Sequence, residues 1–286
     1  MNIIACLALL LHPVAALAAG GALAKALAKP RPVIVHVWDA KPAELQAYAV
    51  EDVSMACREA GATAVLASPE LIGVIAKEQE TSRGNFPGPL PVLADCDLKD
   101  LTDCPEEICF GAKTLGASAI GIRYYEVDWP DAGALEEALQ KVIATSEESS
   151  LPAILLGEFG ADGAEGVTGA TTLASSVGAV AALTKGGEDG GAPAIGCWDG
   201  SERGLQRLRS AGIGGLIVKN ACRGNVAQGA HLKLPSPAAL LVTKLVKAAL
   251  SKGDKTIWAG AGGVGMTGDG GDAQATADKY FNNRGP

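Results

Sequence analysis

Two polar segments in the last third of the sequence combine groups that bind phosphate. Gly200 and Ser201 follow an apolar run and begin a stretch with helical periodicity, while Lys219 and Asn220 follow the next apolar run. Backbone amides at a helix start and a lysine ammonium are common phosphate ligands. The pattern therefore predicts a site for a phosphorylated small molecule, although the neighbouring carboxylate of Asp199 would repel the phosphate.

Carboxylates and a histidine follow or end other apolar runs. Asp95 and Asp97 are separated by one residue, so on a strand they would share a face. Such a pair could hold a divalent cation, or it could consist of solvated carboxylates at a loop end. His36 and Asp39 could form a proton relay, or His36 could be a structural residue at a strand end.

A lysine and further polar residues complete the candidate set. Lys185 begins a Gly-rich loop and could pair with Glu158. Arg123 and the aromatic and charged residues after it, 124–126, suit contact with a ligand or with a partner protein. The seven cysteines contain no CxxC pair and the three histidines are far apart, so we expect no metal and no cofactor.

The elements that must position these groups alternate between short apolar runs and amphipathic helices. The runs predict eight strands, and each is followed by a helix or a loop at spacings that suit right-handed βαβ crossovers. We therefore predict a (β/α)8 TIM barrel over residues 31–252, with a doubly wound parallel sheet as the alternative that the count of eight disfavours. The predicted strands are 33–38, 62–67, 91–94, 117–122, 153–159, 178–183, 193–197 and a last one starting at 216.

Composition limits the class of protein. The 286 residues are 48% hydrophobic and 20% charged, which suits one large globular domain. The net charge of −8 argues against nucleic acid or an anionic membrane surface as the main partner.

The two ends differ from the barrel segment. Residues 1–30 form an apolar leader in which only Lys25 is charged between residues 2 and 28. It could be a cleaved export or thylakoid-transfer signal, an uncleaved membrane anchor, or a buried apolar helix. Residues 253–286 form a Gly/Asp-rich tail that we expect to be flexible or docked on a partner.

Four segments carry a resemblance to a known family. They are VHVWDAKPA (35–43), AGATAVLAS (60–68), PVLADCDL (91–98) and AIGCWDGSERGLQRLRSAGIGGLIV (194–218). Together they resemble strands one, two, three, seven and eight of indole-3-glycerol-phosphate synthase, over roughly Val33 to Leu250. The resemblance depends on strand and helix spacing more than on invariant motifs, and it implies the same barrel fold.

The resemblance also implies that most of that family's acid and base groups are substituted. The first-strand glutamate falls on His36 and the third-strand lysine falls on Asp95, whereas the fifth-strand glutamate is matched by Glu158. The expected protein is then a catalytically degenerate barrel, a structural or binding subunit of a larger membrane-associated complex. We expect it to attach through the leader and the tail, in an algal plastid thylakoid as one possible setting.

The alternative is an active lyase or isomerase that acts on a small phosphorylated metabolite. Glu158, Asp95 and Lys185 would carry its chemistry, and Lys219 would help to bind the phosphate. The two interpretations differ in structure. An enzyme needs polar side chains that converge at the C-terminal ends of the strands, whereas in a scaffold a large residue such as Trp198 or Trp38 would plug that end.

Overall fold

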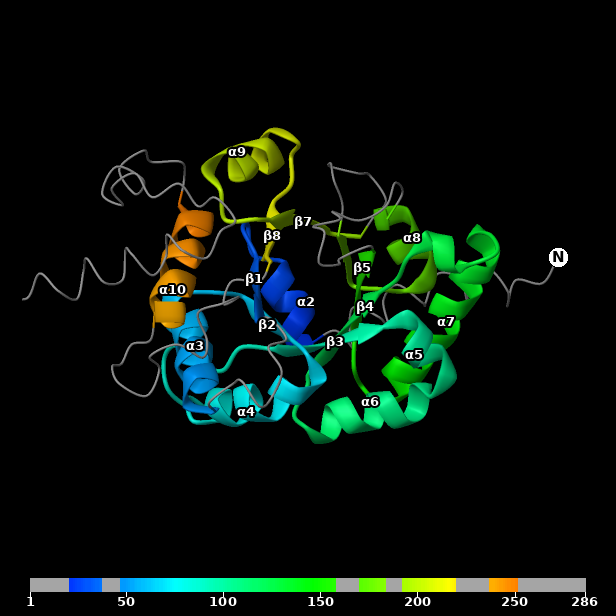
Figure 1. Cartoon of the computed structure of the whole chain (residues 1–286), viewed down its shortest axis with the longest axis horizontal. Helices are drawn as coiled ribbons and strands as arrows, with labels where there is room; N and C mark the ends of the chain where they lie inside the picture. Colours follow the sequence, from blue (N-terminus) through cyan, green and yellow to red (C-terminus); the bar gives the residue numbers. More distant parts are fainter. Residues whose placement is uncertain (1–20, 38–46, 158–169, 184–191, 220–236, 252–286) are drawn as a thin grey trace, which may run out of the picture.

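Eight parallel strands close into a barrel, and helices surround it (Figure 1). The computed structural model describes residues 21–37, 47–157, 170–183, 192–219 and 237–251. Each strand pairs with the next one in sequence, and β8 returns to pair with β1, as Ile217 does with Ile34. The strands are β1 (Val33–Val37), β2 (Ala64–Ala67), β3 (Val92–Asp97), β4 (Ala119–Arg123), β5 (Ala153–Gly157), β6 (Ala181–Leu183), β7 (Ala194–Trp198) and β8 (Gly215–Val218).

The helices follow the strands in the order that the sequence predicts. They are α3 (Ala47–Ala60), α4 (Pro69–Glu80), α5 (Leu98–Asp103), α6 (Pro105–Thr114), α7 (Ala132–Glu148), α8 (Ala170–Val177), α9 (Glu202–Ser210) and α10 (Pro237–Leu250), with a 3-10 turn at Glu126–Asp128. The predicted TIM barrel is confirmed, and the doubly wound sheet is excluded by the pairing of β1 with β8. The periodicity missed the short helix α5 and the 3-10 turn at Glu126–Asp128.

Strand alternation separates two apolar layers. Residues such as Ile34, Leu66 and Leu93 face the barrel interior and form the inner core. Their neighbours Val35, Val65 and Val92 face outward and pack in the larger core that includes the surrounding helices. Each strand is therefore buried on both sides, which explains its continuous apolar run.

Large side chains fill the barrel interior below its C-terminal end. A Cβ atom added to Gly121 of β4 would lie 2.8 Å from the Cδ1 atom of Leu156 and 2.9 Å from that of Leu66. Glycine at this position therefore lets two leucines from β2 and β5 meet inside the barrel. They form a packed floor beneath the polar residues described below.

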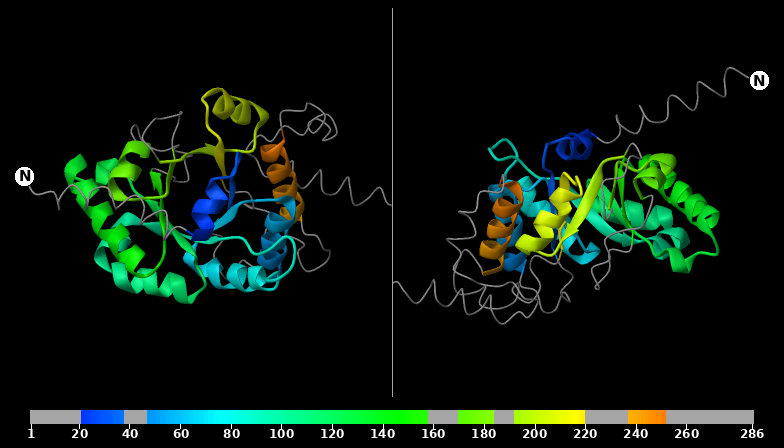
Figure 2. Two further views of the ribbon diagram at one scale, coloured as in Figure 1. Left: turned by 180° about the vertical axis from the view of Figure 1, so that it is seen from behind. Right: turned by 90° about the horizontal axis from the view of Figure 1, so that it is seen from above.

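The helix α2 (Gly21–Leu27) closes the opposite, N-terminal end of the barrel (Figure 2). Leu23 and Leu27 are 2% and 5% exposed, and they join the inner core. This helix lies within the predicted apolar leader 1–30, so the last part of that segment packs as a buried helix. Residues 1–20 of the leader and the tail 253–286 lie outside the described residues.

Two arginines hold the C-terminal end of α10, the last helix of the barrel. Arg31 donates hydrogen bonds to the carbonyl oxygens of Leu250 and Ser251, at 3.3 and 2.8 Å. Arg209 donates to those of Ala249 and Ser251, at 3.1 and 2.6 Å. Burial and then the nearby charge of Arg31 lower the pKa of Arg209. The two like charges are tolerated close together because they donate hydrogen bonds to the last carbonyl oxygens of the helix and lie at the negative end of its dipole.

We expect the substitution Arg209→Ala to lower the free energy of unfolding by roughly 1.5 to 3 kcal/mol, the usual range for hydrogen bonds from a charged donor. Urea denaturation monitored by circular dichroism measures this change. Gln206→Ala, an exposed position on the same helix, is the matched control and should stay within about 0.5 kcal/mol of the wild type. Equal stability of the two variants would contradict the proposed role of Arg209.

Candidate functional site

Three charged or titratable side chains meet at the C-terminal end of the barrel. The Oδ2 atom of Asp95 lies 3.4 Å from Nε2 of His36. Its Oδ1 atom accepts a hydrogen bond of 2.8 Å from Nε of Arg123. The carboxylate of β3 therefore joins a histidine from β1 and an arginine from β4.

Strand geometry places these residues together. His36 and Asp95 each follow an inward-facing residue, Ile34 and Leu93, by two positions, so they share its face. Arg123 is the last residue of β4. All three lie at or near the C-terminal ends of their strands, which is where barrel enzymes place their catalytic groups.

The cluster is largely shielded from water. The side chains of His36, Asp95 and Arg123 are 9%, 11% and 29% exposed. Burial lowers the pKa of the Arg123 guanidinium, but the charge of Asp95, its hydrogen bond and the charge of Asp97 outweigh this effect, so the pKa is raised overall. Arg123 is therefore a fixed cation that compensates the buried carboxylate.

The two aspartates proposed as a cation site both act on Arg123. Asp97 caps α5 by accepting a hydrogen bond of 3.0 Å from the backbone N–H of Lys99. No group of three potential metal ligands occurs among the residues that the structure describes. The guanidinium supplies the positive charge that a divalent cation would otherwise bring to this carboxylate pair.

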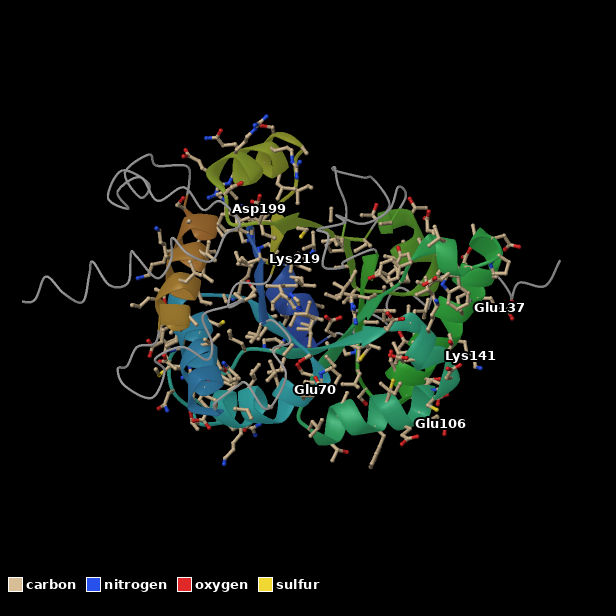
Figure 3. The ribbon with its side chains drawn as sticks, in the orientation of Figure 1. Glu70, Glu106, Glu137, Lys141, Asp199 and Lys219 are labelled. Atoms are coloured by element: carbon tan, nitrogen blue, oxygen red, sulfur yellow. The ribbon has the colours of Figure 1, made fainter. Side chains whose placement is uncertain are left out.

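The predicted phosphate segment lies at the ends of β7 and β8, where Figure 3 labels Asp199 and Lys219. Asp199 accepts a hydrogen bond of 2.9 Å from the backbone N–H of Ser201. Ser201 in turn caps α9 by accepting one of 3.0 Å from the N–H of Gly204. The backbone N–H of Lys219 donates to the carbonyl oxygen of Trp198 at 3.1 Å, which ties the two strand ends together.

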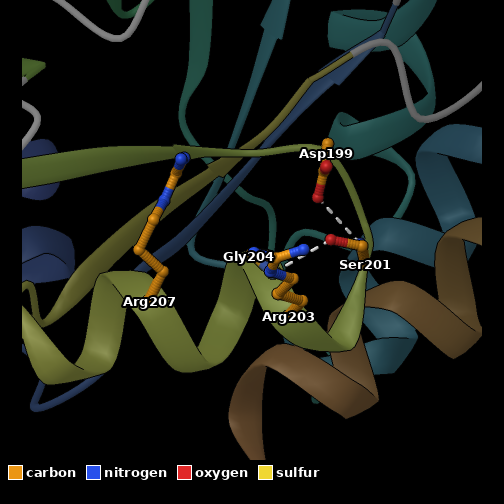
Figure 4. A pocket seen from close by; sticks show the side chains of 5 residues that line it. All are labelled: Asp199, Ser201, Arg203, Gly204 and Arg207. Atoms are coloured by element: carbon orange, nitrogen blue, oxygen red, sulfur yellow. Dashed lines mark hydrogen bonds between the residues drawn. The ribbon is translucent and has the colours of Figure 1, made fainter.

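A pocket of about 400 Å³ opens beside this turn (Figure 4). Asp199 and Ser201 line one part of it, and the exposed side chains of Arg203 and Arg207 line another. The two arginines are one helical turn apart on α9, so both can face the same pocket. The pocket therefore offers two cations to an anion, with one carboxylate beside them.

Trp198 does not plug the end of the barrel. It is fully buried and belongs to the outer core between strands and helices, and its Nε1–H donates to the carbonyl oxygen of Ser201 at 2.7 Å. The plugged arrangement expected of a scaffold is therefore not formed by Trp198. Trp38, the other tryptophan considered for this role, lies outside the described residues.

The structure brings together only part of the predicted site. Asp95 lies in the polar cluster, and Gly200, Ser201 and Lys219 lie at the neighbouring ends of β7 and β8. The described residues do not include Glu158, Lys185 and Asn220, nor Asp39, the suggested partner of His36. The structure gives His36 a different acidic neighbour, Asp95.

Sequence reasoning missed two features of the site. It named Arg123 as a residue suited to contact with a ligand or a partner but did not connect it with Asp95, which precedes it by 28 residues. It gave no role to Arg203 and Arg207 of α9. The sequence contains a signal for each feature. Arg123 occupies an inward-facing position of its strand, and Arg203 and Arg207 are four residues apart on their helix.

The chain matches no family model and no curated protein. It is similar to several solved barrels. The 4-hydroxy-tetrahydrodipicolinate synthase of Methylacidiphilum fumariolicum SolV is 14% identical, with a TM-score of 0.51 over 89% of this chain and 97% of that one. Dihydrodipicolinate synthase of Bacillus clausii is 13% identical, with a TM-score of 0.49 over 83% and 79%. The sialic acid aldolase of Ruminococcus gnavus is 13% identical, with a TM-score of 0.46 over 76% and 79%.

These comparisons correct the family expected from the sequence. The similar barrel with a TM-score above 0.5 is named a 4-hydroxy-tetrahydrodipicolinate synthase, and the assignment to indole-3-glycerol-phosphate synthase is wrong. Its physical basis was strand and helix spacing, which is common to (β/α)8 barrels in general. The interpretation as a catalytically degenerate, membrane-associated member of that family is corrected with it. Attachment to a larger complex and the thylakoid setting stay predictions.

Within the described segments, no helix is both long and apolar enough to cross a membrane.

Cys96 on β3 and Cys104 between α5 and α6 differ in accessibility, which yields a pH-dependent prediction. Burial, together with the charge of Asp95, raises the pKa of the Cys96 thiol to about 12, whereas Cys104 is exposed. Because the thiolate is the reactive form, iodoacetamide at about pH 8 should modify Cys104 and leave Cys96 intact in the folded protein. Peptide mass spectrometry measures this, with the urea-unfolded protein as the control in which both react. Fast labelling of Cys96 in the folded protein would contradict its burial.

Proposed function

We propose that this protein is a TIM-barrel lyase or isomerase that acts on a small phosphorylated metabolite. The observation that carries the proposal is the convergence of His36, Asp95 and Arg123 at the C-terminal end of the barrel. Three charged or titratable groups from three strands lie above a floor of leucines. Burying such groups costs free energy, so their presence indicates either a functional role or complete pairing of their charges and hydrogen bonds.

The cluster suits proton transfer. An imidazole can accept a proton from a carbon next to a carbonyl group, and a carboxylate at its other side orients the ring and stabilises the imidazolium. Asp95 is placed for this role toward His36. Arg123 donates a hydrogen bond to the carboxylate of Asp95 through Nε and offers its remaining donors to an anionic oxygen of the substrate.

The pocket on α9 supports the phosphorylated nature of the substrate. Arg203 and Arg207 of α9 provide the charge, and Ser201, which follows β7, provides a hydroxyl. Barrel enzymes often bind phosphate at the ends of β7 and β8. Lys219 follows β8 and adds a further cation to this region. Glu158 and Lys185 remain members of the proposed acid–base set on sequence grounds, and a lysine amine could also react with a substrate carbonyl.

The similar solved barrels provide only the fold. The one with a TM-score of 0.51 is named a synthase, and that name accords with a lyase on this scaffold. The choice between lyase and isomerase depends on the residues of this chain.

The proton-transfer role predicts a loss of activity in His36→Gln. The probe is dihydroxyacetone phosphate in D₂O, and exchange of its C–H protons is followed by proton NMR. The variant should exchange about 10² to 10⁴ times more slowly than the wild type, the usual contribution of a positioned general base. Phe86→Ala, at an exposed loop before β3, is the matched control and should exchange at the wild-type rate. Equal rates in the wild type and His36→Gln would exclude His36 as the base.

The phosphate site predicts opposite effects of two charge changes. Arg203→Ala combined with Arg207→Ala should weaken binding of inorganic phosphate by about tenfold or more, because two charge-assisted contacts are lost. Asp199→Asn should strengthen it, because a repelling carboxylate becomes neutral. Isothermal titration calorimetry measures both.

The control for these variants is Lys77→Ala combined with Arg83→Ala, two cations that line a separate groove near the start of β3. This control should leave phosphate affinity unchanged. If the wild type binds no phosphate, or if all the variants bind it equally, the proposed substrate class fails.

A further inference from the structure

A buried hydroxyl next to the polar cluster has no visible structural function. Ser68 follows β2 and is 8% exposed, and its Oγ atom has no hydrogen-bond partner in the described part of the chain. A buried hydroxyl without a hydrogen-bond partner lowers the stability of the fold, so a serine at this position indicates a role other than stability.

The usual explanation for a serine at this position does not apply. Ser68 is the N-cap residue of α4, yet its side chain makes no capping hydrogen bond. By contrast, Asp97, Asp131 and Ser201 each accept a hydrogen bond from a backbone N–H of the helix that they precede. In α4 the N–H of Leu71 bonds instead to the backbone carbonyl of Ser68.

Strand register places Ser68 beside the cluster. Leu66 pairs with Leu93 and Ala67 with Ala94, so the next residue of each strand brings Ser68 level with Asp95. The backbone of Ser68 is extended, with φ −62° and ψ 153°, so the alternation of β2 continues and Ser68 shares the inward face of Leu66. Neighbouring strands are about 4.8 Å apart, which puts the hydroxyl next to the cluster on the same face.

The first turn of α4 is itself a poor anion site. Pro69 has no N–H, and Glu70, labelled in Figure 3, carries a negative charge two residues after Ser68. The hydroxyl, rather than the helix amides, is therefore the group that can serve a ligand at this strand end.

We infer that the Ser68 hydroxyl donates a hydrogen bond to the substrate's carbonyl oxygen during proton transfer. The inference rests on the proposed function and adds a residue to its site. In the step, a C–H bond next to the carbonyl breaks and its proton moves to the His36 imidazole. The electron pair forms the C=C bond of an enolate, and the negative charge on the enolate oxygen is stabilised by the O–H of Ser68. The reverse movement of proton and electron pair restores the carbonyl.

A hydroxyl suits this role because the charge develops only as the proton leaves. A donor that is already in place, in a site shielded from water, stabilises that charge without reorganisation. The missing partner of Ser68 in the free protein is then the oxygen atom of the bound substrate. The substrate class becomes a phosphorylated compound with a carbonyl group.

The test compares two probes in the wild type and in Ser68→Ala. Inorganic phosphate reports the phosphate pocket alone, whereas 2-phosphoglycolate adds a carboxylate oxygen that imitates the enolate oxygen. The wild type should bind 2-phosphoglycolate more tightly than phosphate, and Ser68→Ala should reduce that preference by about tenfold while phosphate affinity stays the same. Ser68→Cys keeps nearly the same volume with a poor donor and should behave like Ser68→Ala.

Thermal unfolding separates this role from a structural one. Ser68→Ala removes an unsatisfied polar atom, so its Tm should be equal to or above that of the wild type. Asp131→Ala, the matched control at the N-cap of α7, removes a hydrogen bond of 2.9 Å from the N–H of Ala134 and should lower the Tm without affecting either probe.

The outcomes distinguish the two proposals. If the wild type prefers 2-phosphoglycolate and Ser68→Ala keeps the full preference, the role of Ser68 is overturned while the proposed function stands. A Tm of Ser68→Ala well below the wild type would likewise overturn it, because the hydroxyl would then serve the fold. If the wild type binds neither probe, the proposed function fails and this inference fails with it.

Discussion

The carboxylate of Asp95 organises the C-terminal end of the barrel, because both His36 and Arg123 contact it. The three residues come from β1, β3 and β4, so the interaction links strands that are far apart in sequence. A buried carboxylate needs compensation, and the raised pKa of Arg123 shows that the pair with Asp95 outweighs the cost of burial. The position of the imidazole, and with it any proton transfer at this end, depends on that carboxylate.

The rest of the barrel gives this cluster a rigid base. Leu66 and Leu156 meet over Gly121 beneath it, and α2 closes the far end with Leu23 and Leu27. The last helix is fixed by Arg31 and Arg209. Apolar packing thus holds the strands in fixed positions, as hydrogen bonds between charged side chains on different strands require. The polar cluster lies at one end of the barrel.

The fold could be predicted from the sequence because its signals are local. Gly61, Gly116 and Gly212 have positive φ angles at helix ends, and an apolar strand follows each of them. A glycine between an amphipathic segment and an apolar run therefore marks the end of a helix in the sequence. The candidate site could be predicted only in part because its contacts are not local. Asp95 was recognised by its position after an apolar run, but its pairing with His36 depends on strand order and register. The family assignment failed because it depended on the spacing of strands and helices, which unrelated barrels share.

Comparison with one family's residues also gave a misleading view of the chemistry. Measured against a catalytic lysine, Asp95 is a charge reversal and suggests a lost activity. In its own surroundings the same carboxylate faces a guanidinium on the next strand and an imidazole two strands away, so positive charge is present at the barrel end in a different arrangement. Substitution of one expected residue is therefore weak support for lost catalysis when neighbouring strands supply groups of complementary charge. In this barrel His36, Asp95 and Arg123 converge, with the Ser68 hydroxyl beside them, and the proposed function rests on that convergence.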